Sequence, residues 1–211
     1  MRIILFGDSI TAAGRNLETD NDRDSYGYGY VNFIVGNLTS ESPAKYEIYN
    51  RGISGNRIVD LYARIKADVW NLQPDVLSIL IGINDIWHEV AVNNNGVDIV
   101  RFERVYRMIL DDTLERLPNI KFVILEPFVL KGSATEAHFA EFDKIRDYAK
   151  VVKKIAEEYH ATFVPLQAKF DELAKSYDPT LFLCDGVHPS IAGAKVLADE
   201  WLKSFKKEIE K

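Results

Sequence analysis

The sequence predicts a three-layer α/β domain built around a mostly parallel sheet of five strands. Short apolar runs recur along the 211 residues and alternate with longer stretches of helical period. Strands separated by helices require crossover connections, which give parallel neighbours with helices on both faces of the sheet. The composition suits one hydrophobic core, since 47% of the residues are hydrophobic and 27% are charged. We therefore expect a single domain over residues 1–211.

Five short segments have the composition of strands. The run Val76-Leu77-Ser78-Ile79-Leu80-Ile81 is apolar at every position but one, as expected of a strand covered on both faces. The predicted strands are residues 2–6, 46–50, 76–81, 121–126 and 162–166.

Helical periodicity fills the segments between these strands. Apolar residues that recur every three or four positions share one face of a helix, which then packs against the sheet. The sets are Ile58, Leu61, Ile65, Val69 and Leu72; Phe142, Ile145, Val152, Ile155 and Tyr159; and Ile191, Ala194, Leu197, Trp201, Leu202 and Phe205. The last helix also carries Lys203, Lys206 and Lys207 near its end, where cations complement the helix dipole.

Charge and composition exclude several classes of function. A formal net charge of −6 repels phosphate backbones and anionic lipid, so we expect no nucleic acid and no membrane as partner. No apolar run approaches the ~20 residues of a membrane span. The apolar run at residues 3–6 is too short for a signal peptide, and the single cysteine, Cys184, fits a reducing compartment. We therefore expect a cytoplasmic location.

Ligands of open parallel sheets bind beyond the carboxyl ends of the strands, so the residues there are the candidates for chemistry. Gly7-Asp8-Ser9 follows the first strand, and a glycine turn there can lift the Ser9 hydroxyl above the sheet edge. At a helix N-terminus the hydroxyl would also lie near amides that stabilise negative charge. The alternative is that Asp8 or Ser9 simply caps the helix.

Two further strand ends carry groups suited to stabilising an anion. The second strand leads into Asn50-Arg51-Gly52-Ile53-Ser54-Gly55-Asn56, a glycine turn with accessible amides, or else an ordinary strand-to-helix turn. Ser54 is not the nucleophile of a G-x-S-x-G elbow, because Asn56 stands where that motif needs glycine. After the third strand, the Asn84 side chain offers a hydrogen-bond donor or forms an Asx-turn.

An aspartate and a histidine share one turn near the C-terminus, in Asp185-Gly186-Val187-His188-Pro189. His188 precedes a proline and so belongs to a loop, where Asp185 can accept from Nδ1 and leave Nε2 as a base. A lone histidine there would be structural. Together with Ser9, the glycine turn after the second strand and Asn84, however, the pair supplies every role that acyl transfer requires.

The remaining reactive side chains have simpler explanations. His88 and Glu89 begin a zinc-binding H-E-x-x-H pattern, but position 92 is Val92, so the pattern fails. His138 and His160 lack ligand spacing and are expected at the surface or at helix ends, and Cys184 is expected to pack. We therefore predict no metal and no cofactor.

Because of these motifs, the sequence resembles the SGNH (GDSL) hydrolase family. Gly7-Asp8-Ser9 matches its first block, Gly52-Ile53-Ser54-Gly55 its second, Gly82-Ile83-Asn84-Asp85 its third and Asp185-Gly186-Val187-His188 its fifth. The matches run from near residue 3 to past residue 190 and cover essentially the whole chain. The resemblance implies a flavodoxin-like α/β/α fold (the SGNH hydrolase fold).

The resemblance also implies roles for individual residues. Ser9 would be the nucleophile and His188 the base oriented by Asp185. The oxyanion hole would combine the amides of Ser9 and Gly55 with the side-chain amide of Asn84. Candidate substrate contacts taken from the same segments are Asp8, Ile83, Trp87 and Val187. As a large aromatic, Trp87 equally suits a core or an interface.

Residues flanking these blocks resemble bacterial carbohydrate esterases of the acetylxylan esterase type, as does, loosely, a segment containing Tyr26, Tyr28 and Tyr30. We expect a serine esterase that removes small acyl groups, acetyl above all, from a small-molecule or oligosaccharide ester. The alternatives are a lysophospholipase or thioesterase of the same family, and an inactive carbohydrate-binding protein on the same fold. The loops at residues 14–26, 88–97 and 131–138 are expected to set specificity, and the sequence leaves homo-oligomer formation open.

Overall fold

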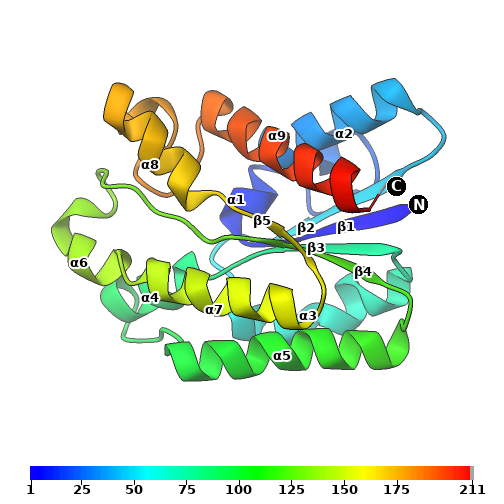
Figure 1. The fold of residues 1–211 in the computed structure, drawn as a ribbon, viewed down its shortest axis with the longest axis horizontal. Coiled ribbons are helices and arrows are strands. Elements are labelled where there is room, and N and C mark those ends of the chain that lie inside the picture. The colour runs from blue at the N-terminus through cyan, green and yellow to red at the C-terminus, as the bar shows by residue number, and fades with distance from the viewer. Residues whose placement is uncertain (210–211) are drawn as a thin grey trace.

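The computed structural model describes residues 1–209 and contains a sheet of five strands, all parallel, in the order β2-β1-β3-β4-β5. The strands are β1 (Arg2–Gly7), β2 (Glu47–Gly52), β3 (Val76–Leu80), β4 (Lys121–Leu125) and β5 (Thr162–Val164). Helices cover both faces, which confirms the predicted α/β/α fold (Figure 1).

The predicted strands at residues 121–126 and 162–166 extend beyond the observed ends of β4 and β5, and the Glu126 carboxylate gives the reason. The Glu126 amide donates to the Val164 oxygen at 3.0 Å, which is the last contact between these strands. Beyond it, the Glu126 carboxylate accepts from the amides of Leu166 at 2.6 Å and Gln167 at 2.9 Å. These bonds turn the chain out of the sheet and satisfy amides at the start of α8 (Gln167–Ser176).

The long helices form the two outer layers. On one face of the sheet lie α2 (Tyr30–Glu41) and α9 (Ile191–Glu208), and on the other lie α3 (Ile58–Asp68), α5 (Ile99–Arg116) and α7 (Ile145–Glu158) (Figure 1). This packing also explains the one polar residue of β3, Ser78. Ser78 is fully buried, and its hydroxyl accepts a hydrogen bond at 2.9 Å from the indole nitrogen of Trp201 on α9.

Two of the predicted helical runs are interrupted. The run from Ile58 to Leu72 is α3 followed by the 3₁₀ turn η2 (Trp70–Leu72), whose spacing of three preserves the apolar pattern. The run that begins at Phe142 is divided between a short α6 (Phe139–Phe142) and α7.

Short elements gather near the carboxyl ends of the strands. They are α1 (Ser9–Ala12), η1 (Arg23–Ser25), α4 (Ile83–Ala91), η3 (Glu136–His138) and η4 (Pro179–Leu181). Because α4 continues to Ala91, the first four residues of the loop expected at residues 88–97 are helical. Within residues 1–209, no helix has the length and apolar character needed to cross a membrane.

Candidate active site

Ser9 begins α1 directly after β1, and the structure confirms the helix cap that the sequence offered as one interpretation of this segment. Asp8 is the N-cap, since its carboxylate accepts from the Ile10 amide at 2.9 Å. This cap leaves the Ser9 hydroxyl free, and Ser9 Oγ lies 2.9 Å from His188 Nε2. Gly7 makes the turn possible, because a Cβ atom there would lie 2.4 Å from the Leu80 oxygen of β3.

The second ring nitrogen of His188 contacts Asp185. Nδ1 lies 2.7 Å from Asp185 Oδ2, while Asp185 Oδ1 accepts from the amides of Val187 at 2.9 Å and His188 at 2.8 Å. The carboxylate is therefore fixed by its own turn and in turn fixes the imidazole. Ser9, His188 and Asp185 form one continuous chain of hydrogen-bonding contacts.

The electrostatics of this chain favour a charged Asp185. Burial raises the pKa of Asp185, but hydrogen bonds from the His188 ring and from the amides of His188 and Val187 outweigh it and lower the pKa to about 2. The same ring contact raises the pKa of His188 above its ordinary 6.5, against an opposing effect of burial. A carboxylate that stays ionised is what an imidazolium intermediate requires.

The turn that carries Asp185 and His188 rests on the loop after β4. Leu130 donates to the Gly186 oxygen at 2.8 Å, and Ala134 donates to the Asp185 oxygen at 3.0 Å. A Cβ atom at Gly132 would lie 2.4 Å from the carbonyl carbon of Asp185, so only glycine allows this approach. The loop at residues 131–138, expected to set specificity, therefore also supports the turn, a role for which the sequence carries no signal.

The candidate oxyanion donors lie on neighbouring turns. Gly55 has a positive φ of 80°, and a Cβ atom built on it would meet nothing within 4 Å, so its backbone faces open space. Within residues 1–209, the amides of Ser9 and Gly55 have no hydrogen-bond acceptor. Asn84 Nδ2 donates at 3.1 Å to the oxygen of Asn56, which orients its amide toward the turn containing Gly55.

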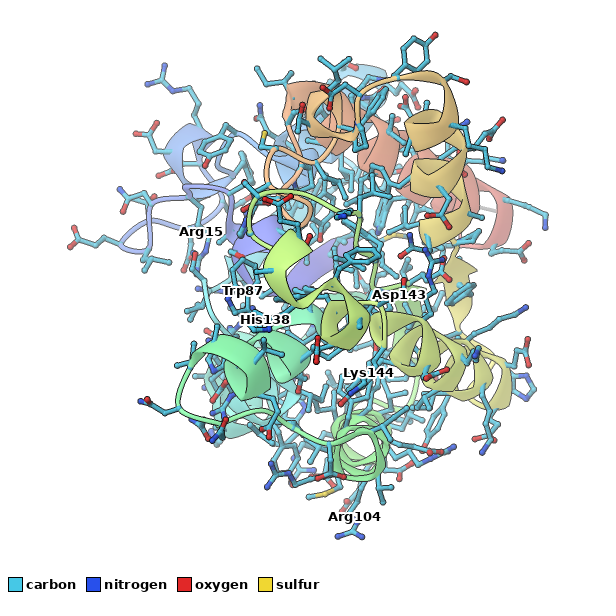
Figure 2. The ribbon with its side chains drawn as sticks, turned by 90° about the vertical axis from the view of Figure 1, so that its left-hand side faces the viewer. Arg15, Trp87, Arg104, His138, Asp143 and Lys144 are labelled. Carbon is cyan, nitrogen blue, oxygen red and sulfur yellow. The ribbon has the colours of Figure 1, made fainter. Side chains whose placement is uncertain are left out.

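Of the four candidate substrate contacts, only Trp87 is partly exposed, and it lies beside the candidate catalytic groups. Its ring centroid lies 6.0 Å from that of His188 and 5.4 Å from that of Phe142. Trp87 is labelled in Figure 2, which shows the molecule from the side of the carboxyl ends of the strands. Asp8, Ile83 and Val187 are buried, so these three side chains offer almost no surface to a ligand, and their substrate contacts stay predictions. These three residues belong to the motifs because they shape the turns, and a residue in that role need not reach the surface.

A small cavity opens beside the candidate catalytic groups. It measures about 90 Å³, and its lining includes Ser9, Tyr28 and His188. A larger cavity, about 590 Å³, lies at the amino ends of the strands, where Lys121 and Thr162 begin β4 and β5. None of the candidate catalytic groups lines this larger cavity, so cavity volume alone does not identify the candidate active site.

The other reactive residues stay outside the site. His138 and His160 are exposed, and no group of three or more His, Cys, Asp or Glu side chains within residues 1–209 is arranged to hold a metal ion. Cys184 was expected to pack, and this is wrong, because its side chain is exposed. Its amide donates to the His188 oxygen at 2.8 Å, so the backbone of Cys184 closes the turn.

Known proteins share both this sequence pattern and this fold. The pattern of the GDSL-like Lipase/Acylhydrolase family matches residues 5–196. An acetylxylan esterase of Geobacillus stearothermophilus is 37% identical over 210 residues, covering 97% of this chain and 93% of that protein.

Solved structures agree with this relationship. A GDSL-like lipase from Parabacteroides merdae superposes with a TM-score of 0.88 at 38% identity, covering 96% of this chain and 94% of that one. The Geobacillus acetylxylan esterase Axe2 superposes with a TM-score of 0.86 at 33% identity, covering 96% and 93%. Variants described as catalytic mutants of Axe2 replace a serine or an aspartate by alanine. The chain thus belongs to the GDSL-like lipase/acylhydrolase family and is a hydrolase of ester bonds.

Proposed function

We propose that this protein is a serine esterase that removes acetyl groups from a carbohydrate through an acyl-enzyme intermediate. The observation that carries the proposal is the continuous contact of Ser9 Oγ with His188 Nε2 at 2.9 Å and of His188 Nδ1 with Asp185 at 2.7 Å. This geometry joins a nucleophile, a base and a carboxylate that orients the base.

The first half of the reaction forms the acyl-enzyme. Ser9 Oγ attacks the ester carbonyl carbon while His188 Nε2 takes the hydroxyl proton, and Asp185 stabilises the resulting imidazolium. The negative charge that develops on the carbonyl oxygen faces the amides of Ser9 and Gly55 and the side chain of Asn84. As the bond to the alcohol oxygen breaks, the imidazolium returns its proton to that oxygen.

The second half releases the acid. A water molecule gives a proton to His188 Nε2 as its oxygen attacks the acyl carbon, and the same donors stabilise the second tetrahedral intermediate. The bond to Ser9 Oγ then breaks, and His188 returns the proton to the serine. Acetate leaves and the free hydroxyl is restored.

The size of the cavity supports a small acyl group. At about 90 Å³, it is well below the roughly 300–1,000 Å³ of pockets that enclose drug-sized ligands, so it suits an acetyl group and not a long chain. The similarity to an acetylxylan esterase over nearly the whole chain supports a carbohydrate as the alcohol.

Replacing Ser9 by alanine tests the proposal. We expect Ser9→Ala to abolish release of p-nitrophenol from p-nitrophenyl acetate while the circular dichroism spectrum and thermal unfolding stay as in the wild type. A fluorophosphonate probe should label the wild type and not the variant. The matched control is Ser54→Ala, which changes an exposed serine in the neighbouring glycine turn and should retain activity. Turnover by Ser9→Ala at the wild-type rate would refute the assignment of the nucleophile.

Acyl chain length separates this function from that of a lipase. Acetate esters should be hydrolysed faster than butyrate and octanoate esters of the same alcohol, because the longer chains exceed the cavity. Equal or faster hydrolysis of octanoate would contradict the small acyl group.

A further inference from the structure

Tyr28 has a large aromatic side chain that lies outside the hydrophobic core. Its side chain is 70% exposed and forms no hydrogen bond within residues 1–209. The neighbouring tyrosines differ. Tyr30 is buried with its hydroxyl 3.0 Å from Thr11 Oγ1, and the Tyr26 hydroxyl donates to Asn21 at 2.9 Å. A single exposed aromatic needs no explanation on its own, so its surroundings decide the matter.

The backbone on both sides of Tyr28 is fixed against the end of α1. A Cβ atom at Gly27 would lie 2.5 Å from the Ala13 oxygen, and one at Gly29 would lie 2.5 Å from the Ala13 Cβ atom. The Tyr28 amide donates to the Ala13 oxygen at 2.9 Å. Because Ala13 is the C-cap of the helix that Ser9 begins, Tyr28 is held at a defined position relative to the nucleophile.

The ring itself rests on Gly14. A Cβ atom at Gly14 would lie 2.4 Å from Cε1 and 3.0 Å from Cδ1 of Tyr28, so the ring occupies space that any other residue would fill. Arg15, labelled in Figure 2, anchors this segment to the sheet, because its buried guanidinium donates from Nε to the Gly52 oxygen at 2.8 Å. The ring is therefore supported from behind and exposed in front, which is the arrangement of a preorganised contact surface.

Tyr28 also borders the small cavity that contains Ser9 and His188. An acetyl group fits into about 90 Å³, but a sugar residue attached to it does not and must remain at the mouth of the cavity. His188 must reach the alcohol oxygen to return its proton, so the sugar at the mouth lies beside His188 and the residues next to it. Tyr28 is the most exposed large side chain of that lining.

We infer that Tyr28 is a specificity-determining residue whose ring stacks against the pyranose ring that carries the acetyl group. A pyranose presents several C–H groups on one face, and an aromatic face that is already ordered binds them at little entropic cost. This inference rests on the proposed function. It assigns the recognition of the sugar to Tyr28 and leaves the chemistry to Ser9, Asp185 and His188.

The test compares Tyr28→Ala with Tyr28→Phe on two acetyl esters. Acetylated xylotriose provides a pyranose ring, and ethyl acetate provides an alcohol with no ring. p-Nitrophenyl acetate is unsuitable, because its own ring can stack on Tyr28. For Tyr28→Ala we expect kcat/KM on acetylated xylotriose to fall about two- to twelvefold, mainly through KM, with ethyl acetate unchanged. Tyr28→Phe keeps the ring and should behave as the wild type on both esters.

A matched control changes an exposed tyrosine away from the cavity. Tyr177 is also exposed, lies just after α8, and does not line this cavity, so Tyr177→Ala should leave both activities unchanged. If the wild type hydrolyses acetylated xylotriose and Tyr28→Ala does so equally well, the inference is wrong and the proposed function stands. An equal loss on ethyl acetate would also overturn it, because Tyr28 would then act on the catalytic groups. If the wild type hydrolyses only ethyl acetate, the carbohydrate substrate is wrong and the inference falls with it.

Discussion

Replacing Asp185 by asparagine removes a charge and nearly preserves the shape of the side chain. In Asp185→Asn the amide oxygen can still accept from the backbone amides of Val187 and His188, which now donate at 2.9 and 2.8 Å. The amide nitrogen then faces His188 Nδ1, where the carboxylate oxygen lies at 2.7 Å in the wild type. The turn therefore keeps its backbone contacts while the partner of the ring changes from an acceptor to a donor.

This change forces His188 into the wrong tautomer. An NH₂ group facing Nδ1 requires Nδ1 to accept, so the ring proton moves to Nε2, which can then no longer take the proton of Ser9. In serine proteases the same exchange lowers kcat about 10⁴-fold, and we expect a loss of that order here. The pKa of His188 should also fall, because the hydrogen bond to Asp185 is the largest effect that raises it.

Steady-state hydrolysis of p-nitrophenyl acetate between pH 5.5 and 9 measures both effects. The variant should unfold thermally near the wild type, since its backbone contacts remain. Asp178→Asn is the control, because exposed Asp178 also accepts from a backbone amide, that of Thr180 at 2.9 Å, and should retain activity. A loss of less than tenfold in Asp185→Asn would show that Asp185 does not set the tautomer of His188.

Three further predictions concern the neighbouring groups. Asn84→Ala should lower kcat on p-nitrophenyl acetate about 10²- to 10³-fold, the cost of one oxyanion donor, and a loss below threefold would remove Asn84 from that role. The wild-type kcat/KM should fall as pH decreases through a midpoint above 6.5, because protonated His188 cannot act as base and its pKa is raised; a profile flat to pH 5 would contradict this. Burial raises the pKa of Asp8 to about 7, whereas the unfolded chain has the ordinary 3.8, so the free energy of unfolding decreases as pH rises between these values. Asp8→Asn keeps an acceptor for the Ile10 amide, and its Tm should therefore drop less than that of the wild type from pH 5 to pH 8; equal drops would refute the effect.

The sequence predicted the fold and the catalytic candidates because both depend on local patterns and one topological rule. The apolar runs of a parallel sheet identify its strands, and a parallel sheet brings all strand ends to one edge. Ser9 and Asn84 follow β1 and β3, which are neighbours in the sheet, so their proximity follows from strand order. His188 lies outside this rule, and its position depends on contacts of its turn with Leu130 and Ala134 that no local pattern encodes.

Other features depend on packing between distant segments and could not be predicted. Tyr28 and Tyr30 are two residues apart and of the same type, yet one is exposed and the other is buried. The difference arises because Gly27 and Gly29 approach Ala13 closely, which turns the intervening side chain outward. Glycine in a sequence signals a permitted close approach, but it does not say which backbone approaches.

The carboxyls near the strand ends differ in how many hydrogen bonds they accept, and this difference makes Asp185 the one suited to orient His188. Asp8 directly precedes Ser9 and influences His188 electrostatically, but one amide hydrogen bond is too little to offset its burial, and its pKa rises to about 7. Asp85 accepts from the Ile58 amide, and burial likewise raises its pKa. Asp185 receives donors from two amides and an imidazole, and of the three carboxyls it is the one whose pKa is lowered. Since an imidazolium is stabilised by a carboxylate that remains ionised, the number of hydrogen-bond donors around each carboxyl determines which one can support the base.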